Sequence, residues 1–215
     1  MADKIQKTGR ISDNFYLINE GFVCSYMLAV GDRFIAFDAG TGPRAVEKAL
    51  AGLSIDPAKV DMVFFTHSDR DHVGGRAAFP KAQAFISKAE EAMLDHTHAR
   101  FLGITYNKPL PFEYSTLEPG EELLIDDVGI RCLPTPGHTV GSMSFLIDDS
   151  ILIVGDECNL RKGKAVLDMR FTSIDNELRA DSIRDLARLE EISLLCTAHS
   201  GYTKDFKSAM EKWRS

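Results

Sequence analysis

The stretch FFTHSDRDHVGG, residues 64–75, constrains the fold of this chain more than any other feature. Two histidines and two aspartates fall within six positions, directly after an apolar run. A short apolar run that ends in polar and turn-forming residues is typical of a buried strand. Because strand ends are rigid, side chains there can be held within the narrow tolerances that metal coordination requires. The motif therefore predicts a metal site at the end of a strand.

Three further strand-like runs also end in a residue that can bind a metal. His138 follows IRCLPTPG, Asp156 follows ILIVG and His199 follows LLCTA. We expect these strand ends to converge, so that a single loop serves two ions about 3.5 to 4 Å apart and Asp156 bridges them. The candidate ligands are His67, Asp69, Asp71, His72, His138, Asp156 and His199. The competing interpretation is a polar loop in which Ser68 and Asp69 cap a helix that starts near Val73.

The remaining pattern predicts strands and helices in alternation. Apolar runs from Phe15, Val23 and Phe34 indicate a β-meander, and Pro43 and Gly52 are placed to begin and end a helix. Residues 88–118 predict a helix followed by a long loop, which is a candidate lid or substrate contact. Residues 122–135, 143–156 and 192–200 predict a second set of short strands, with a hairpin turn at DDS. Residues 176–192 predict an amphipathic helix with a stripe formed by Leu178, Ile183, Leu186, Leu189 and Ile192.

Composition excludes several classes of protein. The chain has 215 residues, 44% of them hydrophobic and 27% charged, which fits one soluble globular domain over residues 1–215. No run approaches the roughly 18 apolar residues of a membrane helix, and the first residues lack the apolar core of a signal peptide, so we expect a cytoplasmic protein. Four dispersed cysteines without a CxxC pair indicate reduced thiols. A net charge of −7 without a basic block excludes nucleic acid as an expected partner.

The motifs THSDRDHVGG, TPGHTVGS, VGDE and TAHSG, in this order, resemble the metal-binding motifs of the metallo-β-lactamase superfamily. The resemblance extends from Ile11 to His199. It implies an α/β fold, a four-layer αβ/βα sandwich with a two-metal site along one edge of the paired sheets. Carried over by position, His67, residue 69 and His138 hold the first ion, Asp71, His72 and His199 hold the second, and Asp156 bridges them.

Position 69 departs from the family pattern, because this chain reads HxDxDH where HxHxDH is usual. A third carboxylate lowers the charge of the site by one unit, worth roughly 4 kcal/mol at about 4 Å in an effective dielectric of about 20. Carboxylate in place of imidazole also moves metal preference from zinc toward iron or manganese. The flavodiiron proteins, an oxygen- and nitric-oxide-reducing branch of the superfamily, are similar in carrying a carboxylate there, although theirs is glutamate.

The resemblance implies a binuclear metal-dependent hydrolase. A metal-bound hydroxide, oriented by Asp71, attacks an ester, thioester, lactone or phosphodiester of a small-molecule substrate. The cofactors are two divalent transition-metal ions: iron, zinc or manganese. The alternative function is a standalone di-iron protein that binds or reduces oxygen or nitric oxide and needs a separate redox partner. A third interpretation is a binding module with a degraded site. It is disfavoured because six of the seven ligand positions carry the residue types that are usual in the family.

Two histidines lie outside this set. His96 and His98, in LDHTHAR, form a literal HxH, yet no strand end precedes them, and we expect a surface or lid role. The presumed substrate-contact segments, residues 95–118 and 159–178, carry no motif that identifies the substrate.

Overall fold

The computed structural model describes residues 1–100, 104–168 and 170–214, and its larger elements form two β-sheets. The first sheet has seven strands in sequence order. Its strands are β1 (Gly9–Arg10), β2 (Phe15–Asn19), β3 (Cys24–Val30), β4 (Arg33–Phe37), β5 (Val60–Phe64), β6 (Gln83–Ser87) and β7 (Ser115–Leu117). Strands β1 to β4 pair antiparallel, and β4 to β7 pair parallel. The predicted meander and the strand leading into the motif are therefore confirmed.

The second sheet has the order β15-β14-β11-β10-β9-β8. Its strands are β8 (Glu122–Ile125), β9 (Val128–Pro134), β10 (Met143–Ile147), β11 (Ile151–Ile153), β14 (Leu194–Thr197) and β15 (Gly201–Thr203). The predicted hairpin joins β10 to β11 in antiparallel register, and Asp148 and Asp149 take the positive φ angles that this tight turn requires. A separate hairpin, β12 (Asn159–Arg161) with β13 (Lys164–Val166), lies where the sequence suggested only a loop.

The helices agree in part with the sequence pattern. Helix α1 (Pro43–Gly52) has the predicted bounds, with Pro43 in its first turn. Helix α4 (Asn176–Ala187) begins after Asp175, whose side chain accepts two backbone N–H groups, and it is shorter than predicted. Leu189 and Ile192 therefore lie beyond it, and Leu178 is 42% exposed rather than part of the buried stripe. The C-terminal helix α5 (Phe206–Met210) was not predicted.

The segment after the motif differs from expectation. Helix α2 (Arg70–Val73) starts three residues before Val73 and ends at Gly74, so the glycines follow a short helix rather than starting a long one. Asp69 occupies the N-cap position, but its side chain makes no capping hydrogen bond. Helix α3 (Glu91–Leu94) is a single turn, and the long loop after it runs into β7. Single 3₁₀ turns complete the chain: η1 (Pro57–Lys59), η2 (Arg76–Ala78), η3 (Lys88–Glu90), η4 (Arg170–Thr172) and η5 (Glu211–Trp213).

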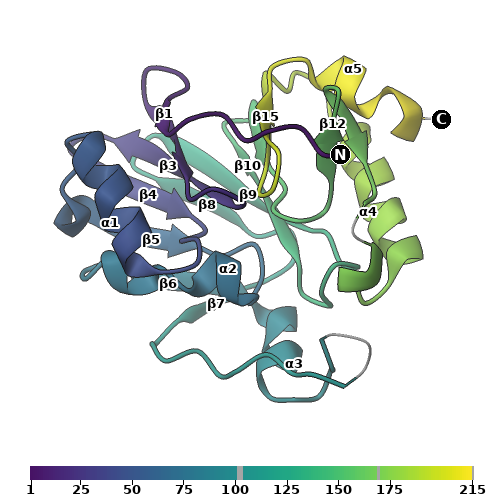
Figure 1. The fold of residues 1–215 in the computed structure, drawn as a ribbon, viewed down its shortest axis with the longest axis horizontal. Coiled ribbons are helices and arrows are strands. Elements are labelled where there is room, and N and C mark those ends of the chain that lie inside the picture. The colour runs from purple at the N-terminus through teal and green to yellow at the C-terminus, as the bar shows by residue number, and fades with distance from the viewer. Residues whose placement is uncertain (101–103, 169, 215) are drawn as a thin grey trace.

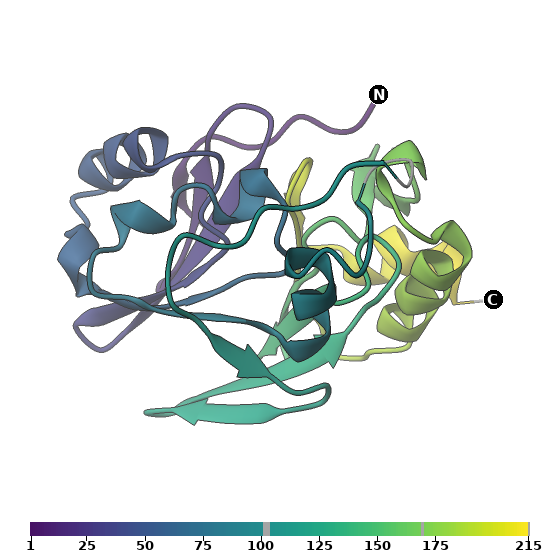
Figure 2. The same cartoon turned by 90° about the horizontal axis from the view of Figure 1, so that it is seen from below.

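Three apolar clusters define the layers. One contains inward-facing residues of both sheets, such as Phe64 and Phe145, and lies between them. A second lies between α1 and the outer face of the first sheet, and a third between α4, α5 and the outer face of the second sheet. Figures 1 and 2 show α1 and α4 on opposite sides of the paired sheets. The predicted four-layer αβ/βα sandwich is thus confirmed.

Two further expectations can be compared with the structure. All four cysteines are free and buried, as predicted. No helix in the described part of the chain is long and apolar enough to cross a membrane.

Candidate metal centre

The predicted ligands come from loops at the ends of four strands. The loop after β5 carries His67, and the residues that follow it include Asp69, Asp71 and His72. Strands β9, β11 and β14 end shortly before His138, Asp156 and His199, respectively. Because these strand ends belong to both sheets, the site forms only where the sheets meet at one edge.

The structure brings all seven predicted side chains together. Their donor atoms form three overlapping groups, each with its atoms within 4.8 Å of one another: His67, Asp69 and His138; His67, His72 and Asp156; and Asp71, His72 and His199. We call the site formed by His67, Asp69 and His138 the first position, and the site formed by Asp71, His72 and His199 the second position. The grouping agrees with the assignment expected from the family resemblance.

The spacing within the groups suits metal ions. Two ligand atoms that each lie about 2.1 Å from a tetrahedral ion are about 3.4 Å apart. Oδ2 of Asp69 lies 3.4 Å from Nε2 of both His67 and His138. At the second position, Nε2 of His199 is 3.4 Å from Oδ2 of Asp71. These separations are long for hydrogen bonds and match the distance between two ligands of one ion.

Asp156 spans the two positions. Its Oδ1 lies 3.4 Å from Nε2 of His72 and 3.2 Å from Nε2 of His199, and its Oδ2 lies 3.3 Å from Nε2 of His138. One carboxylate oxygen therefore faces the second position and the other faces the first. This placement suits the bridging role expected for Asp156.

Each imidazole is oriented through its other ring nitrogen. The Nδ1 atoms face Thr66 Oγ1 at 3.1 Å for His67, Asp38 Oδ2 at 2.9 Å for His72, Ser173 Oγ at 3.4 Å for His138 and the Phe22 carbonyl at 2.7 Å for His199. Partners of this kind fix the ring and direct Nε2 toward a metal. Asp38 also accepts hydrogen bonds from the backbone and side chain of Thr66, so β4 and β5 are joined beneath the site.

The donor atoms that face inward fit a divalent ion. Nε2 of His67, Nε2 of His72 and Oδ1 of Asp156 are buried and make no hydrogen bond within the described residues. A buried polar atom without a partner is costly, and here three such atoms face a common centre. Imidazole and carboxylate are suitable ligands for zinc, iron and manganese. The residues therefore fit the ions that the sequence predicted.

The two positions differ in electrostatics. Burial lowers the pKa of His138 to about 3 despite nearby Asp156, so this imidazole is neutral. Burial also lowers the pKa values of His72 and His199, but the carboxylates outweigh it: Asp38 and Asp156 raise that of His72 well above its usual range, and Asp156 raises that of His199 to about 9. Without an ion, His72 and His199 at the second position thus hold protons, whereas His138 at the first position does not.

Sequence reasoning missed Arg100, which contacts Asp69 directly. Its Nε lies 2.8 and 2.9 Å from the two carboxylate oxygens of Asp69, and its Nη2 lies 2.5 Å from Oδ2. Although burial raises the pKa of Asp69, the nearby side chains of His138, His67 and Arg100 hold it well below its usual range. We expected the carboxylate of Asp69 to lower the net charge of the metal site by one unit. The positively charged guanidinium of Arg100 offsets that change.

Two other polar residues near the site were also missed. Buried Glu90 accepts hydrogen bonds from the backbone and side chain of Ser68 and from Thr139 and Gly141, which joins the His67 loop to the His138 loop. Asn107 donates to Asp69 Oδ1 at 3.0 Å. Neither residue follows a strand directly. Asp38 is different, because it follows the run FIAF as Asp156 follows ILIVG, so the same signal predicts it.

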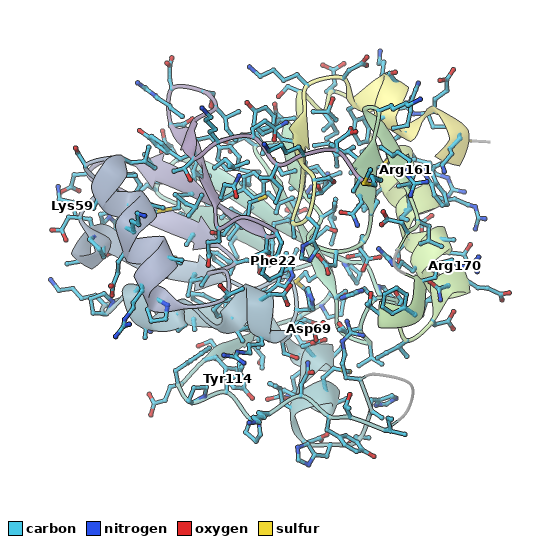
Figure 3. The ribbon with its side chains drawn as sticks, in the orientation of Figure 1. Phe22, Lys59, Asp69, Tyr114, Arg161 and Arg170 are labelled. Atoms are coloured by element: carbon cyan, nitrogen blue, oxygen red, sulfur yellow. The ribbon has the colours of Figure 1, made fainter. Side chains whose placement is uncertain are left out.

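Five of the seven candidate ligands line a cavity of about 670 Å³: Asp69, Asp71, His138, Asp156 and His199. Phe22 forms part of its wall, is 61% exposed and stacks on His199 with ring centroids 5.9 Å apart. The exposed cations Lys4 and Arg70 also line it. Figure 3 shows Phe22 and Asp69 near the middle of the molecule, while Lys59 lies at its left edge.

The presumed contact segments reach this cavity in part. Asn107 and Thr172 line it, as do Asn159 and Asp168. Phe101, which lies in the first segment, and Met169, which lies in the second, are outside the described residues. His96 and His98 are exposed and belong to none of the three ligand groups in the described part of the chain. The ring of His96 packs 5.1 Å from that of Tyr106.

Comparisons with known proteins found relatives of similar sequence and solved structures of similar fold. An N-acyl homoserine lactonase from Bacillus sp. is 27% identical over 149 residues, or 66% of this chain and 55% of the relative. A hydroxyacylglutathione hydrolase from Cereibacter sphaeroides is 27% identical over 178 residues, or 80% of this chain and 62% of the relative. The chain thus spans between about half and two thirds of the length of these curated relatives.

A solved structure of a mutant metallo-β-lactamase from Cronobacter sakazakii has the same fold, with a TM-score of 0.74 and 18% identity over 97% of this chain and 94% of that one. The profile of the metallo-β-lactamase superfamily matches residues 18–189, which include six of the seven candidate ligands. Members of this superfamily are mostly metal-dependent hydrolases. Because the profile covers most of the chain, this protein belongs to the metallo-β-lactamase superfamily.

Proposed function

We propose that the chain hydrolyses an ester, thioester, lactone or phosphodiester at a centre with two ion positions, and that iron, zinc or manganese can serve there. The observation that carries this proposal is the set of inward-facing donor atoms, three of them buried without a hydrogen-bond partner in the described residues. A divalent ion at such a centre acidifies water and polarises the bond to be cleaved.

Asp71 is suited to orient the attacking water and to take its proton. Its side chain is 29% exposed, so it lies at the edge of the cavity, where both substrate and solvent can reach it. The more buried Asp156 faces three histidines, and burial, which raises its pKa, is outweighed by these histidines, which hold the pKa well below its usual range. Asp156 therefore stays ionised as a ligand, and Asp71 is the carboxylate left to move a proton.

The wall of the cavity favours a substrate with both an apolar and an acidic part. The exposed face of Phe22 offers an apolar platform beside His199, and Lys4 and Arg70 offer positive charge. An acyl lactone or a thioester with an acidic group has this combination. The similarity to a lactonase and to a hydroxyacylglutathione hydrolase supports the same choice.

The redox alternative rested on the carboxylate at position 69. Both oxygens of Asp69 accept hydrogen bonds from Arg100, so this carboxylate is already neutralised by a protein cation. The observation that favoured a harder, iron-selective site is therefore weaker than the sequence suggested, and hydrolysis is the function we propose.

The test is hydrolysis of a substrate panel by protein loaded separately with zinc, manganese or iron. We expect turnover of at least one ester, lactone or thioester, and loss of that turnover in Asp71→Asn, whose ion content is measured in parallel. Oxygen consumption by the iron-loaded protein with a chemical reductant is followed in parallel. Rapid oxygen turnover, with no member of the panel hydrolysed in any metal form, contradicts the proposal.

A further inference from the structure

The guanidinium of Arg100 lies where an ion at the first position would lie. Its Nη2 is 2.5 Å from Oδ2 of Asp69 and 2.7 Å from Nε2 of His138, although these two ligand atoms are 3.4 Å from each other. Nη2 therefore sits between the two donors, only a few tenths of an ångström farther from each than a zinc ion would be, since zinc ligands lie at about 2.0 to 2.2 Å.

An ion and this nitrogen exclude each other. A guanidinium has donors but no acceptor, so His138 Nε2 must present its lone pair to Arg100, and that lone pair is the one that binds a metal. Both oxygens of Asp69 are engaged as well. Of the three donors at the first position, only His67 Nε2 is without a hydrogen-bond partner in the described residues.

Arg100 is held in this place from both sides. Its Nη1 donates to the backbone carbonyl of Thr172, in η4 on the opposite wall of the cavity, and its side chain is only 10% exposed. A planar fork with two carboxylate contacts and a backbone contact is a geometry that lysine cannot reproduce. The contact is thus a specific one rather than a loose surface pair.

Within the described residues, no arginine or lysine side chain forms a hydrogen bond or ion pair with the donors of the second position. Nε2 of His72 makes no hydrogen bond in the described residues, and neither does Oδ1 of Asp156, which faces this side of the site. Arg70, the nearest arginine in sequence, is exposed at the cavity wall. The donors around Asp71, His72 and His199 are therefore available to an ion without displacing a protein cation.

We infer that Arg100 occupies the first position in the resting protein, so that one divalent ion binds tightly at the second position and another binds only when the guanidinium withdraws. This inference rests on the proposed function for the existence of the metal centre, and it adds that the two ions bind unequally. It assigns to Arg100 the role of a protein cation that stands in for the first ion.

The test is a zinc titration of chelator-treated full-length protein, followed by calorimetry and by elemental analysis after gel filtration. The parent is expected to bind one zinc ion at least about tenfold more tightly than a second, and Arg100→Gln to tighten the second by at least about tenfold. Arg184→Gln, an exposed substitution on α4, is the matched control and is expected to behave as the parent does. Circular dichroism checks that each variant folds.

A crystal structure of the parent with one equivalent of zinc provides a second reading that needs no variant. The inference expects the ion at Asp71, His72 and His199 with Arg100 still on Asp69. Two ions of equal affinity in the parent, or a single ion at His67 and His138 with Arg100 displaced, would overturn it. If neither the parent nor the variant binds zinc, the assignment of a metal centre is wrong. If the two ions bind unequally but no panel member is hydrolysed, only the proposed function is wrong.

Discussion

The two ion positions are built from the same kinds of ligand and differ in what surrounds them. At the first, Asp69 and His138 face a buried arginine, and His138 is neutral because burial lowers its pKa to about 3. At the second, burial lowers the pKa of His199 but Asp156 outweighs it and raises the pKa to about 9, and Asp71 and His199 line the cavity. The difference teaches that candidate ligands of the same kinds, read from sequence, can lie in unlike surroundings, which is the basis for inferring unequal ion binding.

The largest expected effect comes from the second position. Asp71→Ala removes a ligand and the proposed proton acceptor, so kcat/KM for any substrate that the parent hydrolyses should fall by a factor of about 10³ or more. Asp69→Ala, the matched change at the first position, should cost only about tenfold. Steady-state kinetics decide, and equal losses in the two variants would break the distinction between the positions.

The second prediction concerns Asp38, which orients the ring of His72. Asp38→Asn weakens the acceptor that orients this imidazole, so zinc affinity at the second position should fall by about 10- to 100-fold. Competition with a chromophoric chelator measures it, alongside a thermal melt. Asp61→Asn, a partly exposed carboxylate that pairs with Arg33, is the control. Unchanged affinity in the Asp38 variant would mean that the ring of His72 is oriented by other contacts.

The third prediction concerns pH. The raised pKa of His199 stabilises the ion-free fold below about pH 6.5, its unperturbed value, and this contribution is lost as the pH rises through about 9. Zinc binding at the second position must displace this proton and the one on His72, so affinity should rise between pH 7 and 9 by up to about tenfold per pH unit for each proton displaced. Calorimetry in buffers of different ionisation enthalpy counts the protons released. Release of none at pH 7 would contradict the electrostatic difference between the positions.

The fourth prediction concerns a substitution at position 69 that removes the partner of Arg100. Asp69→His restores the usual family pattern and removes the carboxylate partner of Arg100, so binding of the second zinc ion should tighten by about tenfold. The zinc-loaded variant should also show the alkaline limb of hydrolysis at lower pH, because a site with one less negative charge makes bound water more acidic. A variant with the affinities and pH profile of the parent would show that Asp69 does not reach the ion.

The smallest effect is expected outside both positions. His96→Ala and His98→Ala should change kcat/KM by less than about tenfold, which is about 1.4 kcal/mol in the barrier. Both side chains are exposed and lie in none of the ligand groups found in the described residues. Loss of bound zinc in the His98 variant would mean that the segment after α3 reaches the metal.

The sequence predicted the convergence of the seven candidate ligands, but not the residues around them, for a physical reason. His138, Asp156 and His199 each follow an apolar strand, and strand ends at one sheet edge must meet, so local pattern is enough to place them. Asp38 also follows an apolar strand, β4, so the same pattern predicts it, although it is not among the seven candidate ligands. Arg100 has no such signal, because it lies in a segment without periodicity and meets Asp69 across 31 positions of the chain.

Short strands and helices were also predicted poorly from the sequence. Strands β7, β12 and β13 have three residues each, too few for a period to appear, and their pairing with neighbours rather than their sequence makes them strands. Helix α2 starts at Arg70 because the chain must turn directly after Asp69 to bring His72 back toward His67. The pattern of glycines alone placed that start too late.

The hydrogen bonds of Glu90 have a consequence for how such a site can evolve. One buried carboxylate joins Ser68 on one side to Thr139 and Gly141 on the other, and Gly141 approaches it so closely that a β-carbon there would lie 2.1 Å from the Glu90 nitrogen. The Ser68 and Gly141 amides should therefore exchange with deuterium slowly and together, as parts of one rigid frame. The side chain of Asn107 donates to Ser68 Oγ at 2.7 Å and to Asp69 Oδ1 at 3.0 Å, so the loop after α3 is attached to this frame. Sequence changes in that loop therefore alter the surroundings of the first position as well as the wall of the cavity.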